Sequence, residues 1–150
     1  MATPRDDPYG RFNFLVDLGG GETEGPGAGF MEVTGLGVSV DIVEYRNGND
    51  RSAAPRKISG LTKVSDVVLR RGVIGSLGLW QWLEQVRQGD QNAHRTVTIS
   101  LQSEDRSAVA QTWRLLRARP RRYVVPSLDA LASGVAIEEL VLAAEDIEVE

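Results

Sequence analysis

VDIVEYRNGNDRSAAPRKISGLTKVSDVVLRRGV, residues 40–73, is the stretch around which the rest of the chain is organised. Apolar and polar residues alternate at both of its ends, which predicts two β-strands. Between them lies a polar connector, at about residues 46–62, roughly three to four times the usual two to five residues of a hairpin loop. A loop of this length on a compact domain is usually functional or disordered. We interpret it as an arm that reaches another copy of the same protein.

Composition is typical of a soluble globular domain and excludes several kinds of chemistry. The 150 residues carry a net charge of −4, so no general attraction to nucleic acid or anionic lipid is expected. The chain has no cysteine, which excludes thiolate nucleophiles and cysteine metal sites. Its only histidine, His94, lies in a polar turn, so neither a multi-histidine metal site nor a Ser-His-Asp triad is expected. No apolar run approaches the roughly 20 residues of a membrane span.

Strands are predicted wherever apolar residues alternate between turn-forming segments. The two ends of the opening stretch belong to the predicted strands at residues 30–45 and 64–73, and the other predicted strands are residues 11–18, 96–102, 109–118 and 135–149. A kink is expected at Gly35 and Gly37, and the change of apolar parity after Ile42 indicates a β-bulge. Pro120 and Pro126 predict a loop or a strand edge over residues 121–131.

One helix is predicted at residues 76–88, with Ser76 as its N-cap and Gly89 as the glycine after its C-terminus. An apolar stripe runs along one side of it: Leu79, Trp80, Trp82, Leu83 and Val86. We interpret this stripe as packing on a sheet, with a partner-binding edge as the alternative. Because no βαβ alternation occurs, we expect a mainly antiparallel single domain over residues 1–150, either a β-sandwich or a partly closed barrel, with one flanking α-helix.

Two other segments suggest chemistry, but each has a simpler interpretation. The glycine-rich loop at residues 19–29 lacks the Gly-Lys-Ser/Thr ending and the following helix that a phosphate cradle needs. A basic cluster beside Tyr123 resembles a nucleic-acid groove, but a solvated or subunit-facing strip paired with a neighbour's acidic tail is favoured. The cluster consists of Arg114, Arg117, Arg119, Arg121 and Arg122. Glu138 and Glu139 point to opposite faces of a strand, so they are not an acid/base pair.

Several motifs, in their order and spacing, carry a resemblance to a known family. They are DPYGRFNFLVDL, GFMEVTGLGVSVDIVEYRNGND, RKISGLTKVSDVVLRRGV, LWQWLEQV, RPRRYVVPSLDA and VAIEELVLAAEDIEV. The most specific are EYRNGND (44–50), KISGLTK (57–63), LRRG (69–72) and the Pro–Tyr–Pro run at residues 120–126. Over nearly its whole length the chain resembles the tail-tube proteins of contractile phage tails, and especially the inner-tube subunits of extracellular contractile injection systems.

The resemblance implies a tail-tube fold and a structural role without enzyme activity. Hexameric rings would stack into a hollow tube inside a contractile sheath. The implied partners are other copies of the chain, sheath, baseplate and spike proteins, a terminator cap, and a protein or DNA cargo in the lumen. Assembly would take place in the cytoplasm, and the product would be a phage tail or a released contractile particle. A tube-initiating baseplate ring or a terminal tube cap is the alternative, and a nucleic-acid-binding β-barrel is less favoured.

The expected site residues form two groups, and neither is catalytic, cofactor-binding or metal-binding. The first group would form the contacts between subunits and between rings: Glu44, Tyr45, Arg46, Gly48, Asp50, Arg51, Arg56, Lys57, Leu61 and Lys63. The second group, on the polar side of the helix, would face the sheath: Gln81, Glu84, Gln85 and Gln88.

Overall fold

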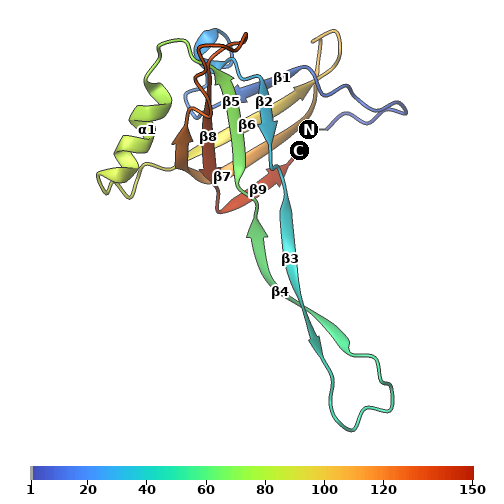
Figure 1. The fold of residues 1–150 in the computed structure, drawn as a ribbon. Helices are drawn as coiled ribbons and strands as arrows, with labels where there is room; N and C mark the ends of the chain where they lie inside the picture. The colour runs from blue at the N-terminus through green and yellow to red at the C-terminus, as the bar shows by residue number, and fades with distance from the viewer. Residues whose placement is uncertain (1) are drawn as a thin grey trace.

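The computed structural model describes residues 2–150 (Figure 1). Within this range the chain forms nine strands, one short 3-10 helix and one α-helix. The strands are β1 (Phe14–Asp17), β2 (Glu32–Thr34), β3 (Val38–Tyr45), β4 (Arg56–Val64), β5 (Val67–Gly72), β6 (Arg95–Gln102), β7 (Val109–Val124), β8 (Ile137–Ala143) and β9 (Asp146–Val149). The helices are η1 (Pro26–Ala28) and α1 (Gly78–Arg87).

Seven strands form one antiparallel sheet in the order β1-β6-β7-β8-β5-β2, with β9 also paired to β7. Strand β7 is 16 residues long and joins the two halves of this sheet. The first part of β7 pairs with β6 and β9, and its last part pairs with β8. Between these parts Arg117 has a φ of 51°, a left-handed conformation that interrupts an extended strand. The sheet therefore folds over itself as an open sandwich. Its end strands, β1 and β2, do not pair with each other, so the sheet does not close into a barrel, and the expected mainly antiparallel fold with one flanking helix is confirmed.

The hydrophobic core lies between the two halves of the sheet and under α1. Val97 and Leu115 come from one half, Leu69 and Leu140 from the other, and Trp82 from α1; each is at most 1% exposed. Full burial of such side chains stabilises the fold by roughly 1.5–3 kcal/mol each. The expected alternation along residues 96–102 and the packing of the helix on the sheet are thus confirmed.

Helix α1 differs from the expectation at its N-terminus and in one tryptophan. The N-cap is Leu77 rather than Ser76, whose Oγ accepts only a long 3.4 Å hydrogen bond from the N–H of Gly78. Gly89 has the expected positive φ, at 87°, just beyond the C-terminus. Trp80, at the border of the apolar stripe, is 40% exposed and packs edge-on against Tyr123.

Two of the predicted strand boundaries are wrong, for reasons of topology. Strand β7 continues through Pro120, because the register shifts at this proline and a residue at a bulge does not need a ladder N–H. The predicted closing strand at residues 135–149 is divided into β8 and β9. Since β8 pairs with the second part of β7 and β9 with the first part, the chain must cross from one half of the sheet to the other.

Strands β3 and β4 leave the domain as a two-stranded antiparallel ribbon (Figure 1). The expected kink is confirmed at Gly35, where φ is +88° and a Cβ would lie 2.1 Å from the carbonyl oxygen of Asp66. The expected bulge is also found, between Val40 and Ile42. The expectation of an irregular connector over residues 46–62 is wrong, because cross-strand pairing extends β4 over Arg56–Val64 and leaves only residues 46–55 as a loop.

Candidate functional site

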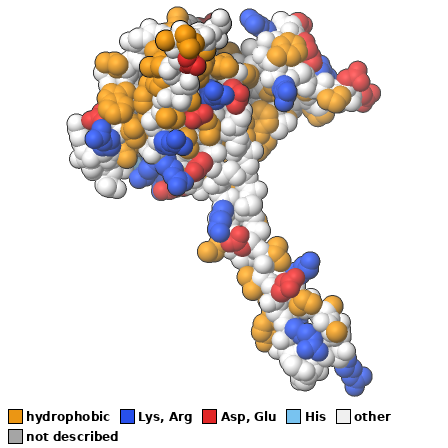
Figure 2. Space-filling model, viewed as in Figure 1, with side chains coloured by type: hydrophobic (Ala, Val, Ile, Leu, Met, Phe, Trp, Pro, Cys, Tyr) orange, Lys and Arg blue, Asp and Glu red, His pale blue; other side chains and the backbone are white. Residues whose placement is uncertain are grey.

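The β3–β4 ribbon is exposed along its whole length, although half of it is apolar. Every residue of β3 is exposed, as is every residue of β4 except Val64. The exposed large apolar side chains are Val38, Val40, Ile42, Val43, Tyr45, Ile58 and Leu61. In Figure 2 these apolar side chains alternate with charged ones along the ribbon, away from the body of the domain. An isolated two-stranded hairpin is at best marginally stable in water, so this ribbon has a surface that is suited to a partner.

Polar contacts along the ribbon hold its two strands in register. Near the domain Lys63 pairs with Asp41 at 3.2 Å, across the bulge. Near the free end Arg56 lies 3.7 Å from a carboxylate oxygen of Asp50, and its guanidinium lies over the ring of Tyr45. These exposed pairs are each worth at most about 1 kcal/mol, so they align the ribbon more than they stabilise it.

The loop at residues 46–55 is folded around its own polar groups. The guanidinium of Arg46 donates to the carbonyl oxygens of Asp50 and Ser52, each at 2.9 Å. The backbone N–H of Asn47 donates to the carboxylate of Asp50 at 3.0 Å, and the hydroxyl of Tyr45 donates to the side chain of Asn47 at 2.5 Å. The loop therefore has a shape of its own, which these hydrogen bonds hold at the end of the ribbon.

The structure places the expected interface residues on this one projecting element. Glu44 and Tyr45 end β3; Arg46, Gly48, Asp50 and Arg51 lie in the loop; Arg56, Lys57, Leu61 and Lys63 lie on β4. Their role in contacts between subunits is untested and remains a prediction. Sequence reasoning missed five apolar members of the same surface: Val38, Val40, Ile42, Val43 and Ile58. The signal was present, because these residues occupy both parities of a strand that has no cover within the chain.

The expected sheath-facing residues lie on the outer side of α1. Gln81, Gln85 and Gln88 are exposed, whereas Glu84 is half-buried and pairs with Arg87 one turn later. Helix α1 packs on β7, and two of these exposed side chains, Gln81 and Gln85, border the cavity between α1 and the start of β6. The position is compatible with contact to another protein but does not test it.

The basic cluster on β7 is mostly neutralised within the chain. Arg114 pairs with Glu150, Arg117 with Glu145 at 3.4 Å, and Arg121 with Asp66 at 2.5 Å. The acidic tail that the sequence assigned to a neighbour therefore belongs, at least in part, to the same subunit. This pairing lowers the positive potential that a nucleic-acid groove requires.

Residues 2–150 contain no group of three or more His, Cys, Asp or Glu side chains arranged to hold a metal ion. None of the helices in this range is both long enough and apolar enough to span a bilayer. His94 is exposed, as expected for a turn residue. The exposed ribbon is therefore the feature of the described chain that most needs a functional explanation.

Comparison with known proteins agrees with this geometry. The chain is similar to a chain of the PVC sheath-tube complex of an extracellular contractile injection system, with 29% identity and a TM-score of 0.82 over 95% of this chain and 91% of that one. It is also similar to a chain of the anti-feeding prophage cap, described as tube-terminating, with 25% identity and a TM-score of 0.84 over 100% and 95% of the two chains. A chain of the anti-feeding prophage baseplate is 26% identical, with a TM-score of 0.77 over 100% and 97%.

No curated protein matches the sequence. The profile of one family, described as T4-like virus tail tube protein gp19, matches residues 10–148. That range includes all nine strands, α1 and the ribbon, apart from the last residue of β9. Because the match covers nearly the whole chain, this protein belongs to the T4-like virus tail tube protein gp19 family.

Proposed function

We propose that this chain is the repeating subunit of the inner tube of a contractile injection system or a phage tail. Six copies would form a ring, and rings would stack into a hollow tube inside a contractile sheath. Family membership makes the chain a structural tube protein, and such proteins are not enzymes. The observation that carries the assembly step is the β3–β4 ribbon, whose apolar side chains have nothing to pack against within one subunit.

The position of the apolar residues indicates how the ribbon would be used. They occupy both faces of the two strands, and a strand that is apolar on both faces is normally covered on both. The ribbon would therefore lie between neighbouring subunits of the same ring or of the next one. Each apolar side chain that becomes fully buried there would contribute roughly 1.5–3 kcal/mol. Of the ten ribbon residues expected from the sequence, Tyr45 and Leu61 would belong to this apolar contact, and the charged residues among the others would form its polar part.

Further partners follow from this role. The polar side of α1, with Gln81, Glu84, Gln85 and Gln88, would face the sheath subunit. Support for a sheath, a baseplate and a cap as partners comes from the structural neighbours, which are chains of a sheath-tube complex, a baseplate and a tube-terminating cap. The lumen would hold a protein or DNA cargo and the tube would begin on a baseplate with a spike. The tube would assemble in the cytoplasm before it becomes part of the particle.

A tube-initiating baseplate ring or a terminal cap is the second candidate. The TM-score is 0.84 against the chain of the anti-feeding prophage cap and 0.82 against the chain of the sheath-tube complex. Structural similarity therefore supports a cap as much as it supports a main tube subunit. The two candidates differ in what the protein forms with baseplate components present. A main subunit would form long tubes, whereas an initiator or cap would form single rings, and electron microscopy distinguishes the two.

Removal of the ribbon tests the assembly step. In the test variant a two-residue Asn-Gly turn replaces residues 38–64 and joins Gly37 to Ser65, whose backbone groups already bond at 3.0 Å. Loop-closure entropy changes by only about 0.6 kcal/mol per doubling of length, so the seven-stranded domain should still fold. Tubes and rings should be absent in electron micrographs. Tubes of normal length from the shortened protein would refute the proposal, and failure to fold would show that the ribbon belongs to the domain core.

A further inference from the structure

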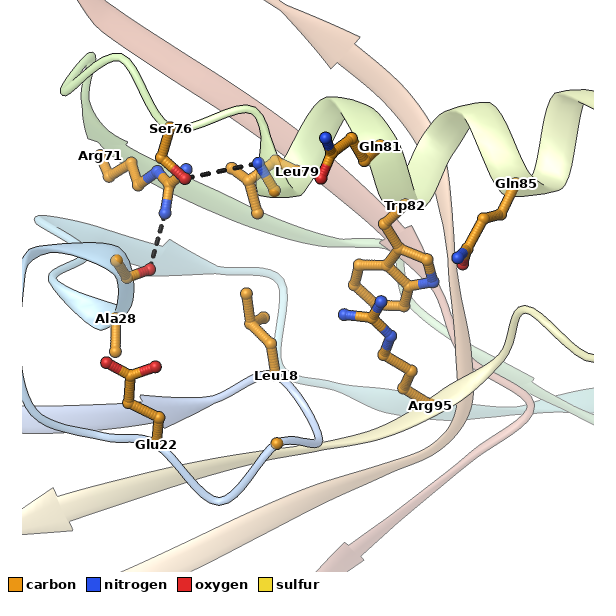
Figure 3. A pocket seen from close by; sticks show the side chains of 13 residues that line it. Leu18, Glu22, Ala28, Arg71, Ser76, Leu79, Gln81, Trp82, Gln85 and Arg95 are labelled. Carbon is orange, nitrogen blue, oxygen red and sulfur yellow. Dashed lines mark hydrogen bonds between the residues drawn. The ribbon is translucent and has the colours of Figure 1, made fainter.

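A cavity of about 360 Å³ lies between α1, the first residue of β6 and the glycine-rich loop that follows β1 (Figure 3). This is large enough for a small ligand or for one inserted side chain. Ribbon and cavity share no residues, so assembly through the ribbon does not explain it. Three groups around the cavity are electropositive, and each comes from a different element.

The first group is the guanidinium of Arg71 on β5, which is 2% exposed. Its Nε donates to Glu138 at 2.5 Å and its Nη1 donates to the carbonyl oxygen of Gly27 at 2.6 Å. Its Nη2 is buried and has no hydrogen-bond partner among residues 2–150. Buried N–H groups are nearly always satisfied, so this guanidinium, which lines the cavity, lacks one acceptor in the free subunit.

The second group is the guanidinium of Arg95, which lies over the ring of Trp82, 4.5 Å from its centroid. Figure 3 shows this side chain reaching from β6 toward α1 across the cavity. Within residues 2–150 it forms no ion pair with any acidic side chain. Unlike Arg71, whose charge Glu138 balances, Arg95 therefore brings an uncompensated positive charge to a half-buried site.

The third group is the N-terminus of α1. Its N-cap, Leu77, makes no side-chain hydrogen bond, and its first turn contains no acidic residue. The N–H of Gly78 has only the long contact with Ser76, and that of Leu79 has no partner in the described chain. The N-terminal N–H groups of a helix attract anions, because they carry a partial positive charge and need acceptors.

From these three groups we infer that the cavity binds an oxyanion, namely a phosphate or a carboxylate. The anion would lie between Arg95 and the first turn of α1, and the guanidinium of Arg71 would add positive charge from the wall of the cavity. One acidic residue, Glu22 on the glycine-rich loop, also lines the cavity without pairing to either arginine. Glu22 would compete with the ligand. The ligand would be either a free anion or an acidic side chain of an adjoining protein chain.

Calorimetric titration of the unassembled full-length subunit with sodium phosphate and with sodium acetate tests this inference, at ionic strength held constant with sodium chloride. Saturable binding of at least one anion is expected. Arg95→Gln should raise its Kd by about tenfold or more, because it removes a charge-assisted hydrogen bond. Arg122→Gln removes the same charge from an exposed arginine outside the cavity and should leave the Kd unchanged. Glu22→Gln should lower it.

Absence of saturable binding, or an equal Kd in the Arg95 and Arg122 variants, would overturn the inference. Thermal unfolding of each variant checks the fold, and the exposed Glu22 substitution keeps the test valid even if Arg95→Gln is destabilised. A second titration, on assembled rings or tubes, distinguishes a free anion from an acidic side chain of an adjoining protein chain as the ligand. This step rests on the proposed function. Loss of phosphate binding on assembly would identify an acidic side chain of a neighbouring chain as the ligand, whereas retained binding would identify a free anion.

Discussion

Nε of Arg71 donates a 2.5 Å hydrogen bond to Oε1 of Glu138, and the two side chains are only 2% and 3% exposed. The hydroxyl of Tyr123 donates to the other carboxylate oxygen, also at 2.5 Å. Burial, and then this hydrogen bond, raise the pKa of Tyr123 to about 12. The three residues come from β5, β8 and β7, so one polar network joins three adjacent strands of the sheet.

Glu138→Gln should therefore destabilise the free subunit strongly. Loss of one partner of a buried ion pair leaves the other charge uncompensated, and the expected loss in the free energy of unfolding is about 3–5 kcal/mol. Urea unfolding measures it. The double variant Arg71→Met with Glu138→Leu removes both charges and should be more stable than the single variant. A single-variant loss below about 1 kcal/mol, the range of surface pairs, would show that the pair is not effectively buried.

Acid should weaken the attachment of the N-terminal segment. Arg5 bonds to both carboxylate oxygens of Glu104, at 2.9 and 2.5 Å, and this lowers the pKa of Glu104 from 4.5 to about 2. Hydrogen bonds from Ser107 likewise lower the pKa of Asp105 from 3.8 to about 2. Since both values are lower in the folded state, the ionised groups stabilise it above their unfolded values. That contribution disappears as the pH falls from about 4.5 to about 2.

Thermal unfolding of the wild type and of Glu104→Gln/Asp105→Asn between pH 7 and pH 2 tests this linkage. The wild type should have the higher Tm at pH 7, and the two curves should converge as the pH approaches 2. Parallel curves over the whole range would contradict the assignment.

Gly35→Ala should destabilise the point at which the ribbon leaves the sheet. A Cβ there would lie 2.1 Å from the carbonyl oxygen of Asp66, at a φ of +88°. Strain of this kind is worth about 1–3 kcal/mol, and the steric clash adds to it. Gly48→Ala in the ribbon loop is the matched control, because no atom lies within 4 Å of its Cβ position, and it should change the stability by less than about 0.5 kcal/mol. Equal unfolding midpoints for the two variants would contradict the prediction.

Strands and helices that have one face on the core of their own subunit and the other face toward solvent could be predicted from the sequence. The alternation of β6 and the apolar stripe of α1 are of this kind, because the domain itself supplies the core that they face. Pro120 within β7 and the break between β8 and β9 show the limit of local rules. Whether a proline is tolerated, or where a strand is divided, depends on which half of the sheet each segment pairs with, and the residues themselves do not carry this information.

The ribbon was predicted as an arm and its first strand was predicted within residues 30–45, but the strand character of residues 56–63 was not predicted. Residues 56–63 contain three lysines or arginines and only two large apolar residues, a pattern that is typical of a loop on a single domain. Their pairing with β3 depends on the bulge after Val40, which changes the face that each side chain occupies. The exposure of the apolar residues Val43 and Ile58 was not predicted, because the single chain does not contain the surface that would cover them.

The outer face of α1 provides a test of the contact with the sheath. Gln81→Arg combined with Gln88→Arg adds two positive charges to an exposed surface and should leave the fold intact. Sheath assembly around the variant tube should weaken, and negative-stain electron microscopy of reconstituted particles measures it. Gln81→Asn with Gln88→Asn, which adds no charge, should assemble normally. A normal sheath on the arginine variant would place this face elsewhere in the particle.

The apolar surface of the ribbon allows assembly to be separated from folding. Ile42 and Leu61 are 54% and 76% exposed in the subunit, so Ile42→Thr with Leu61→Thr should change its free energy of unfolding by less than about 0.5 kcal/mol. If both side chains are buried between subunits, their loss should weaken each contact by roughly 3–6 kcal/mol, or about a hundredfold or more in affinity.

Tube formation by the threonine variant should therefore require a much higher protein concentration, measured by sedimentation and electron microscopy beside urea unfolding of the subunit. Ile42→Val with Leu61→Met keeps the surface apolar and is the matched control, which should form tubes as the wild type does. Two results would contradict the proposed role of the ribbon. Normal tubes from the threonine variant would show that its apolar face is not an assembly contact. A large loss of subunit stability would show instead that the ribbon packs against its own domain, because only side chains already buried in the free subunit can contribute to its folding.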